Sequence, residues 1–151
     1  MRPNQNRFPS PIAAVVFDLL NPIPFAFFVG GLIFDVAYAN SAEILWMKAA
    51  AWLIAIGLVA AVIPRLINLV RVWAPGRRPR PFAVKAAFWL HLVGIVAAIV
   101  NAFVHSRDAY AVIPEGLLLS ILTVALFVVG NVFLSLQRTG LDASLDTKVQ
   151  A

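Results

Sequence analysis

Apolar residues along this chain form four long stretches, at about residues 24–39, 42–66, 82–106 and 114–137. A helix needs about 20 apolar residues to cross the roughly 30 Å of hydrocarbon in a bilayer. The last three stretches reach this length by themselves, and the first reaches it only with help from the apolar segment before it. Because helices satisfy their own backbone hydrogen bonds in lipid, the pattern predicts an all-α integral membrane four-helix bundle.

The segments outside residues 24–138 are predicted to flank this domain. The apolar segment Pro11–Leu20 is separated from the first span by the sequence NPIP. Pro22 and Pro24 would interrupt a continuous helix there, because proline lacks a backbone N–H. Residues 1–23 are therefore predicted to be a cytoplasmic N-terminus with an interfacial or half-inserted helix. Residues 139–151 are polar, and we predict that they form a loose cytoplasmic tail.

The composition supports a membrane environment. The chain is 62% hydrophobic and 13% charged, with a mean hydropathy of +0.88. Soluble domains have about 25% charged residues. The absence of cysteine excludes Cys-ligated zinc and iron–sulfur clusters. The sequence has no basic face with interleaved aromatic residues, the pattern that would indicate nucleic-acid binding. The expected partners are the lipid bilayer and other membrane subunits or a second copy of the chain.

Basic residues predict the orientation. With both termini in the cytoplasm, Lys48 and Arg107 lie on the outer side, and the other ten basic residues lie on or near the inner side. We therefore expect a multi-pass protein of the bacterial inner membrane. The basic residues between the second and third spans are predicted to contact anionic lipid headgroups, and they are Arg77, Arg78, Arg80 and Lys85.

The two histidines, His91 and His105, both lie in the third predicted span. On a helix their spacing corresponds to roughly 21 Å of rise and about 40° of rotation, so they share one face near opposite sides of a bilayer. This geometry suits two cofactors, or one buried site and one residue at the interface.

Polar residues near the outer side of the spans form a predicted layer, and they are Asp35, Lys48, Asn101, His105, Arg107 and Ser120. One interpretation is structural: Asp35 pairs with Lys48 or Arg107, and His105 lies within reach of Asp35. The alternative is a polar pocket in which a quinone headgroup or a redox partner would form hydrogen bonds.

His91 and Asn131 both lie roughly 10 Å from the inner ends of their helices. Gly30 and Gly31 fall at a similar depth, so these four residues are candidates for one cofactor-binding layer. Either His91 is neutral and hydrogen-bonded to Asn131 or to a carbonyl, or it is an axial ligand of haem b. Bis-histidine ligation would require a homodimer or a partner subunit, because no other span contains a histidine. Pigment binding is a further alternative, since alanine precedes His91 by four residues, as in bacterial antenna helices.

Several short motifs resemble a known family. The first span, NPIPFAFFVGGLIFD, has Pro22, Phe25 and Asp35, with Asn21 in place of a leading histidine. The second span ends in VIPRLINL, and the third has His91 near its start and Arg107 at its end. The fourth begins EGLLLSILTVALFVVG. Over about residues 20–138, the chain resembles the bacterial membrane-protein family known as domain of unknown function 2231.

This resemblance implies a four-helix inner-membrane protein. Relatives in that family occur beside, or fused to, redox modules such as Rieske-type proteins or periplasmic sugar dehydrogenases, which implies electron transfer or anchoring. If the family binds haem through its leading histidine and the third-span histidine, the asparagine at position 21 means that this chain has lost one ligand.

The sequence contains no nucleophile–base pair, carboxylate dyad or glycine-rich phosphate loop that would indicate an enzyme. We therefore expect a non-catalytic subunit that anchors or organises a larger membrane complex, without a cofactor. The alternatives are an electron-transfer subunit that binds haem b or quinone near His91 or His105, a pigment-associated subunit, and a transporter that would need to oligomerise.

Overall fold

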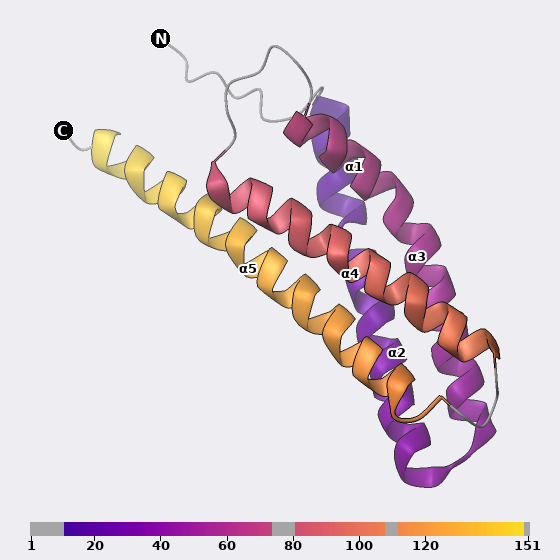
Figure 1. Ribbon diagram of the computed structural model, residues 1–151. Helices are drawn as coiled ribbons and strands as arrows, with labels where there is room; N and C mark the ends of the chain where they lie inside the picture. Colours follow the sequence, from indigo (N-terminus) through magenta and orange to yellow (C-terminus); the bar gives the residue numbers. More distant parts are fainter. Residues whose placement is uncertain (1–10, 74–80, 108–111, 150–151) are drawn as a thin grey trace.

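The computed structural model describes residues 11–73, 81–107 and 112–149, and every regular element in these ranges is a helix. The helices are α1 (Pro11–Leu20), α2 (Pro22–Ser41), α3 (Ile44–Trp73), α4 (Phe82–Arg107) and α5 (Glu115–Val149) (Figure 1). The segments long and apolar enough to cross a membrane are Val15–Ser41, Ile44–Val70, Phe82–Arg107 and Glu115–Gln137. The prediction of an all-α bundle with four membrane-spanning helices is confirmed.

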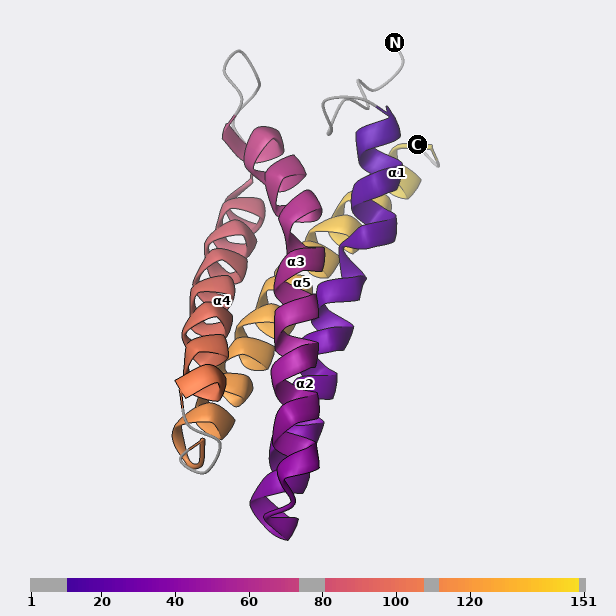
Figure 2. The same cartoon turned by 90° about the vertical axis from the view of Figure 1, so that its right-hand side faces the viewer.

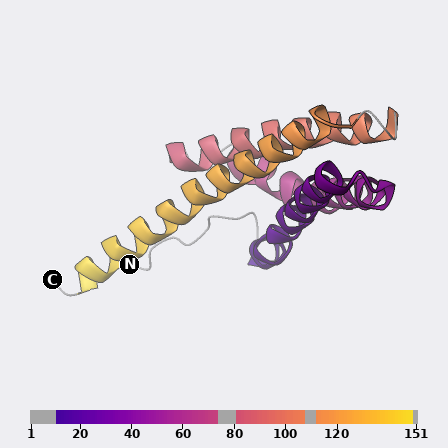
Figure 3. The ribbon, with the colours of Figure 1, turned by 90° about the horizontal axis from the view of Figure 1, so that it is seen from below.

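The four long helices form two antiparallel hairpins. Helix α2 packs mainly on α3, and α4 packs mainly on α5, while fewer contacts join α2 to α5 and α3 to α4. Seen from below, α4 and α5 lie on one side of the molecule, and the other helices lie on the opposite side (Figure 3). The two hairpins form one bundle through the contacts of α2 with α5 and of α3 with α4.

The junction between α1 and α2 lies at Asn21, as the prolines predict. Pro22 is the first residue of α2, where its missing N–H costs no helical hydrogen bond. Asn21 keeps helical backbone angles and its N–H donates to the Phe17 carbonyl, so the chain bends without leaving the helical conformation. Helix α1 continues in the general direction of α2 (Figure 2). The segment long and apolar enough to cross a membrane begins at Val15, inside α1.

Buried positions recur at alternating steps of three and four residues along each long helix. On α4 the buried residues at these steps are Val84, Ala87, His91, Gly94, Ala98, Asn101 and His105. Such a 3.5-residue repeat is typical of helices that pack in a left-handed bundle. Large apolar side chains occupy the other faces, where a bilayer would cover them.

Two phenylalanines join the hairpins at the middle of the bundle. The ring of Phe28 on α2 meets the ring of Phe127 on α5 edge to face, with 5.1 Å between centroids. Both rings are buried, and Ala98 of α4 completes the cluster. Helix α4 can approach because residue 94 is glycine: a Cβ there would lie 2.9 Å from the Phe127 ring. Small residues thus allow the close helix packing that stabilises bundles in lipid.

Two helices extend beyond the predicted spans. Helix α3 continues to Trp73, with Pro64 inside it. Helix α5 continues to Val149, so the prediction of a loose tail after the fourth span is wrong. The segment after Gln137 contains no proline, the residue that most strongly interrupts a helix, so nothing in it ends the helix that begins in the span.

Candidate functional site

A hydrogen-bonded polar cluster joins the two hairpins near the α2–α3 end of the bundle. It consists of Asp35 on α2, Asn101 and His105 on α4, and Ser120 on α5. The amide Nδ2 of Asn101 donates to the Ser120 hydroxyl at 2.7 Å, and that hydroxyl donates to Oδ2 of Asp35 at 2.5 Å. Nε2 of His105 lies 2.8 Å from Oδ1 of Asp35. Three helices are therefore tied together by one carboxyl group.

The geometry of the cluster fixes how many protons it holds. Nδ1 of His105 lies 3.0 Å from the Asn101 carbonyl oxygen, which can only accept, so Nδ1 carries a proton. One further proton lies between Nε2 of His105 and Oδ1 of Asp35. Either it makes the ring an imidazolium beside a carboxylate, or it makes Asp35 a neutral acid that donates to the ring. In both states the pair has no net charge, which suits its complete burial.

The polar cluster is tightly packed. Asp35 is 0% exposed and His105 is 6% exposed. The space beside Asn101 and Ser120, lined also by Phe28, Ala98 and Thr123 among others, has no room for a water molecule. A quinone headgroup in this layer would therefore require side chains to move apart.

The predicted pairing of Asp35 with Lys48 or Arg107 is wrong, whereas its proximity to His105 is confirmed. Both basic side chains are exposed, while Asp35 faces the interior of the bundle. Long basic side chains at helix ends extend to water or to lipid headgroups, where their charge is solvated. The imidazole, being short and able to share a proton, is the group that fits beside the buried carboxyl.

His91, the other histidine, forms a separate contact nearer the end of the bundle where α3 ends and α4 begins. Nε2 of His91 lies 3.2 Å from Oδ1 of Asn131, so the predicted contact between them is confirmed. The His91 ring also meets the Phe127 ring edge to face, with centroids 4.9 Å apart. A Cβ at Gly130 would lie 2.9 Å from Nε2, so glycine is needed for the helices to approach here. His91 is 1% exposed.

Gly30 and Gly31 do not join His91, contrary to the prediction of one layer. A Cβ at Gly30 would meet Leu53, and one at Gly31 would meet Ile54, so both glycines face α3. The depths also differ: Gly31 lies against Ile54, which lines one space with Asn101 and Ser120. His91 lies nearer the other end of the bundle, at the ring of Phe127 that Arg65 also contacts.

The residues present do not fit haem or a chlorin at either histidine. An axial ligand needs a ring nitrogen free to face the metal. Both nitrogens of His105 form hydrogen bonds. Nε2 of His91 faces Asn131 and Gly130 at contact distance. Nδ1 of His91 has no hydrogen-bond partner among the described residues, but the side chain is only 1% exposed and packs on Phe127, so no macrocycle can face either nitrogen unless the helices move apart.

A partly buried arginine is the functional candidate that sequence reasoning missed. Arg65 on α3 was assigned only to the basic residues that set the orientation. In the structure its Nη2 donates to Oδ1 of Asn21 at the α1–α2 junction. Its guanidinium carbon lies 5.6 Å from the centroid of the Phe127 ring, the same ring that His91 contacts. The available signal was its position five residues inside the end of the apolar segment Ile44–Val70.

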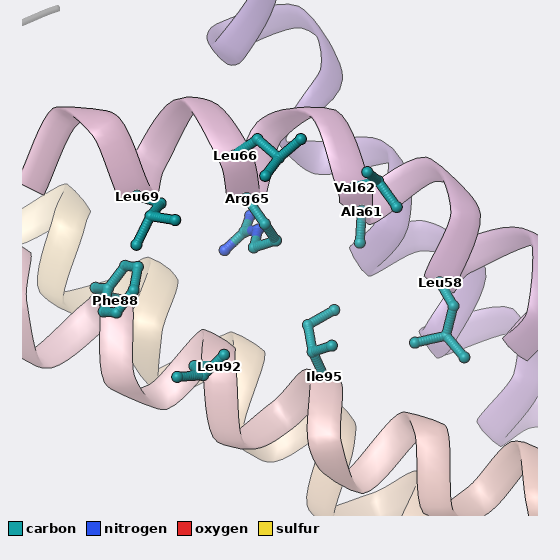
Figure 4. A pocket seen from close by; sticks show the side chains of 9 residues that line it. All are labelled: Leu58, Ala61, Val62, Arg65, Leu66, Leu69, Phe88, Leu92 and Ile95. Atoms are coloured by element: carbon teal, nitrogen blue, oxygen red, sulfur yellow. The ribbon is translucent and has the colours of Figure 1, made fainter.

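Arg65 lines a groove of about 250 Å³ between α3 and α4 (Figure 4). The other lining residues are apolar: Leu58, Ala61, Val62, Leu66 and Leu69 of α3, and Phe88, Leu92 and Ile95 of α4. The groove is partly open, and several of these side chains are exposed on the surface that a bilayer would cover. Nε and Nη1 of Arg65 are buried and have no hydrogen-bond partner among the described residues.

Among the predicted headgroup contacts, Lys85 is exposed near the start of α4, as that role requires. Arg77, Arg78 and Arg80 lie outside the described residues. Close to this end, Trp73 meets the rings of Phe88 and Trp89 at centroid distances of 6.2 and 6.4 Å. Tryptophan is enriched where a membrane meets water.

Comparison of the chain with protein-family models, with curated proteins and with solved structures finds no match. The resemblance to domain of unknown function 2231 therefore stays a prediction from short motifs.

Proposed function

We propose that this protein is a non-catalytic integral membrane subunit that anchors or organises a larger assembly. The observation that carries the proposal is how the polar side chains in the bundle are used. The ring nitrogens of His105 and the carboxyl oxygens of Asp35 form hydrogen bonds between helices, and His91 does the same with Asn131. These side chains join helices: the contacts of Asp35 tie α2 to the α4–α5 hairpin, and the contact of His91 with Asn131 ties α4 to α5.

A bundle fastened in this way is suited to support. Polar contacts in lipid specify one arrangement of helices, because the alternative pairings leave polar groups without partners. The outward faces then present a fixed apolar surface to lipid or to neighbouring membrane subunits. The charge distribution supports a bacterial inner-membrane location with both termini in the cytoplasm.

The electron-transfer and pigment alternatives have less support. They need an imidazole that faces an open space, and both histidines are enclosed. Haem b or a chlorin at these residues would require the contacts of His91 with Gly130, or of His105 with Asp35, to be broken first.

Purification from the native host in a mild detergent tests the anchoring role. We expect the chain to migrate in a complex larger than itself, with one or more other subunits in fixed stoichiometry. Asp35→Leu weakens the contacts between the two hairpins and should reduce the recovery of that complex. Lys48→Gln, on the exposed surface, is the matched control and should leave the recovery unchanged. Recovery of the chain alone or only with itself, under conditions that preserve other membrane complexes, would contradict the proposal.

A further inference from the structure

The groove between α3 and α4 combines an apolar surface with an uncompensated positive charge. Only Nη2 of Arg65 has a hydrogen-bond partner, and that partner is the neutral amide of Asn21. In the described ranges no carboxylate lies within ion-pair distance of Arg65. A cation away from water is costly unless an anion accompanies it. An occupant of the groove that brings a negative charge would therefore be favoured.

The rest of the groove indicates what carries that charge. Its walls are hydrocarbon, and Val62 and Leu66 at its edge are 52% and 58% exposed on the surface that lipid would cover. An occupant can thus enter sideways from the bilayer. The volume of about 250 Å³ lies below the range of roughly 300–1,000 Å³ that is typical of enclosed small-molecule sites. A slender alkyl chain fits such a space better than a ring system does.

The depth of Arg65 restricts the headgroup. It lies five residues before Val70, where the apolar segment ends, which corresponds to roughly 7.5 Å along the helix. A phosphodiester with its glycerol and second chain is bulky and strongly hydrated, whereas a carboxylate is the smallest anionic headgroup. Its oxygens can accept from Nε and Nη1, the two donors that lack partners.

We propose that this groove binds a single-chain fatty acid, with the alkyl chain between α3 and α4 and the carboxylate against Arg65. Phe88, Leu92 and Ile95 form the α4 wall of the chain site. The cation–π contact with Phe127 and the hydrogen bond to Asn21 hold the guanidinium in place for the carboxylate. This site is independent of the anchoring role, so either proposal can fail without the other.

Native mass spectrometry of the delipidated protein tests the proposal, with palmitate as the probe and with phosphatidylglycerol and a short-chain ubiquinone as competitors. We expect one palmitate per chain, displaced by neither competitor at equal concentration. Arg65→Gln should weaken palmitate binding by about tenfold or more, which corresponds to the loss of a charge-assisted hydrogen bond. Lys85→Gln removes the same charge at an exposed position near the same end and should leave binding unchanged.

A second variant keeps the test decisive if Arg65→Gln does not fold. Val62→Trp fills the groove from its exposed edge and leaves Arg65 intact, so palmitate binding should be lost while the helix content is retained. Palmitate binding that persists in both variants, or in whichever of them folds, would overturn the site. Preferential retention of phosphatidylglycerol or of ubiquinone would overturn the choice of ligand.

Discussion

Two substitutions of Asp35, which pairs with His105 in the interior of the bundle, test how much its hydrogen bonds contribute to stability. Replacing Asp35 by asparagine keeps the shape of the side chain. Its Nδ2 can donate to Nε2 of His105, and its Oδ1 can accept from the Ser120 hydroxyl, so both hydrogen bonds survive. Replacing Asp35 by leucine keeps the branching of the side chain but adds bulk and removes both bonds. It leaves Nε2 of His105 and the hydroxyl proton of Ser120 without a partner, while the contacts of Nδ1 and of the hydroxyl oxygen with Asn101 remain.

The magnitudes follow from these lost contacts. Hydrogen bonds between helices in membranes contribute about 0.6 kcal/mol on average and about 1.7 kcal/mol at most. A buried polar group left without a partner costs about 1–3 kcal/mol. Asp35→Leu loses two bonds and strands two groups, so we expect a free energy of unfolding lower by about 2–4 kcal/mol. Asp35→Asn should cost less than about 1 kcal/mol, because the network closes again.

Reversible unfolding in mixed detergent micelles, followed by circular dichroism, measures both variants. A double-mutant cycle of Asp35→Leu with His105→Leu isolates the pair, and we expect a coupling energy of about 1–3 kcal/mol. Equal losses for asparagine and leucine, or a coupling energy near zero, would refute the argument that this pair ties the hairpins together.

Two further predictions use positions with opposite surroundings. Gly130→Ala should destabilise the bundle by about 1–3 kcal/mol, because the new methyl group would lie 2.9 Å from Nε2 of His91. Gly140→Ala, where a Cβ would meet nothing within 4 Å, should be neutral or slightly stabilising. Equal stability of the two variants in the same micelle assay would contradict the packing at Gly130. Neutralising Lys48 or Arg107 to glutamine should change the free energy of unfolding by less than about 0.5 kcal/mol, since both side chains are exposed; a loss as large as that of the buried pair would show that one of them stabilises the carboxyl after all.

The four spans could be predicted from the sequence because the bilayer imposes a length and an apolar composition on each helix. Which face of a helix is buried was harder to predict. In lipid the outward face is as apolar as the interior, so periodicity in hydrophobicity gives little information. On α4 the interior face is instead recognisable by its small and polar residues, such as Gly94, Asn101 and His105.

Contacts between polar residues were predictable where few partners existed. With two histidines and few other polar groups at each depth, His91 had Asn131 and His105 had Asp35 within reach. The role of Arg65 was not predictable in the same way. Its burial depends on the bend at Asn21 and on the separation of α3 from α4, and neither is encoded in residues next to it.

The central claim is that both histidines hold helices together and bind no cofactor. A dithionite-reduced minus air-oxidised absorption spectrum of the protein, purified from its native host in a mild detergent, tests this most directly. The account predicts no haem band and no stoichiometric pigment. A sharp visible α-band with a shifted Soret band, abolished by His91→Asn or His105→Asn, would contradict it.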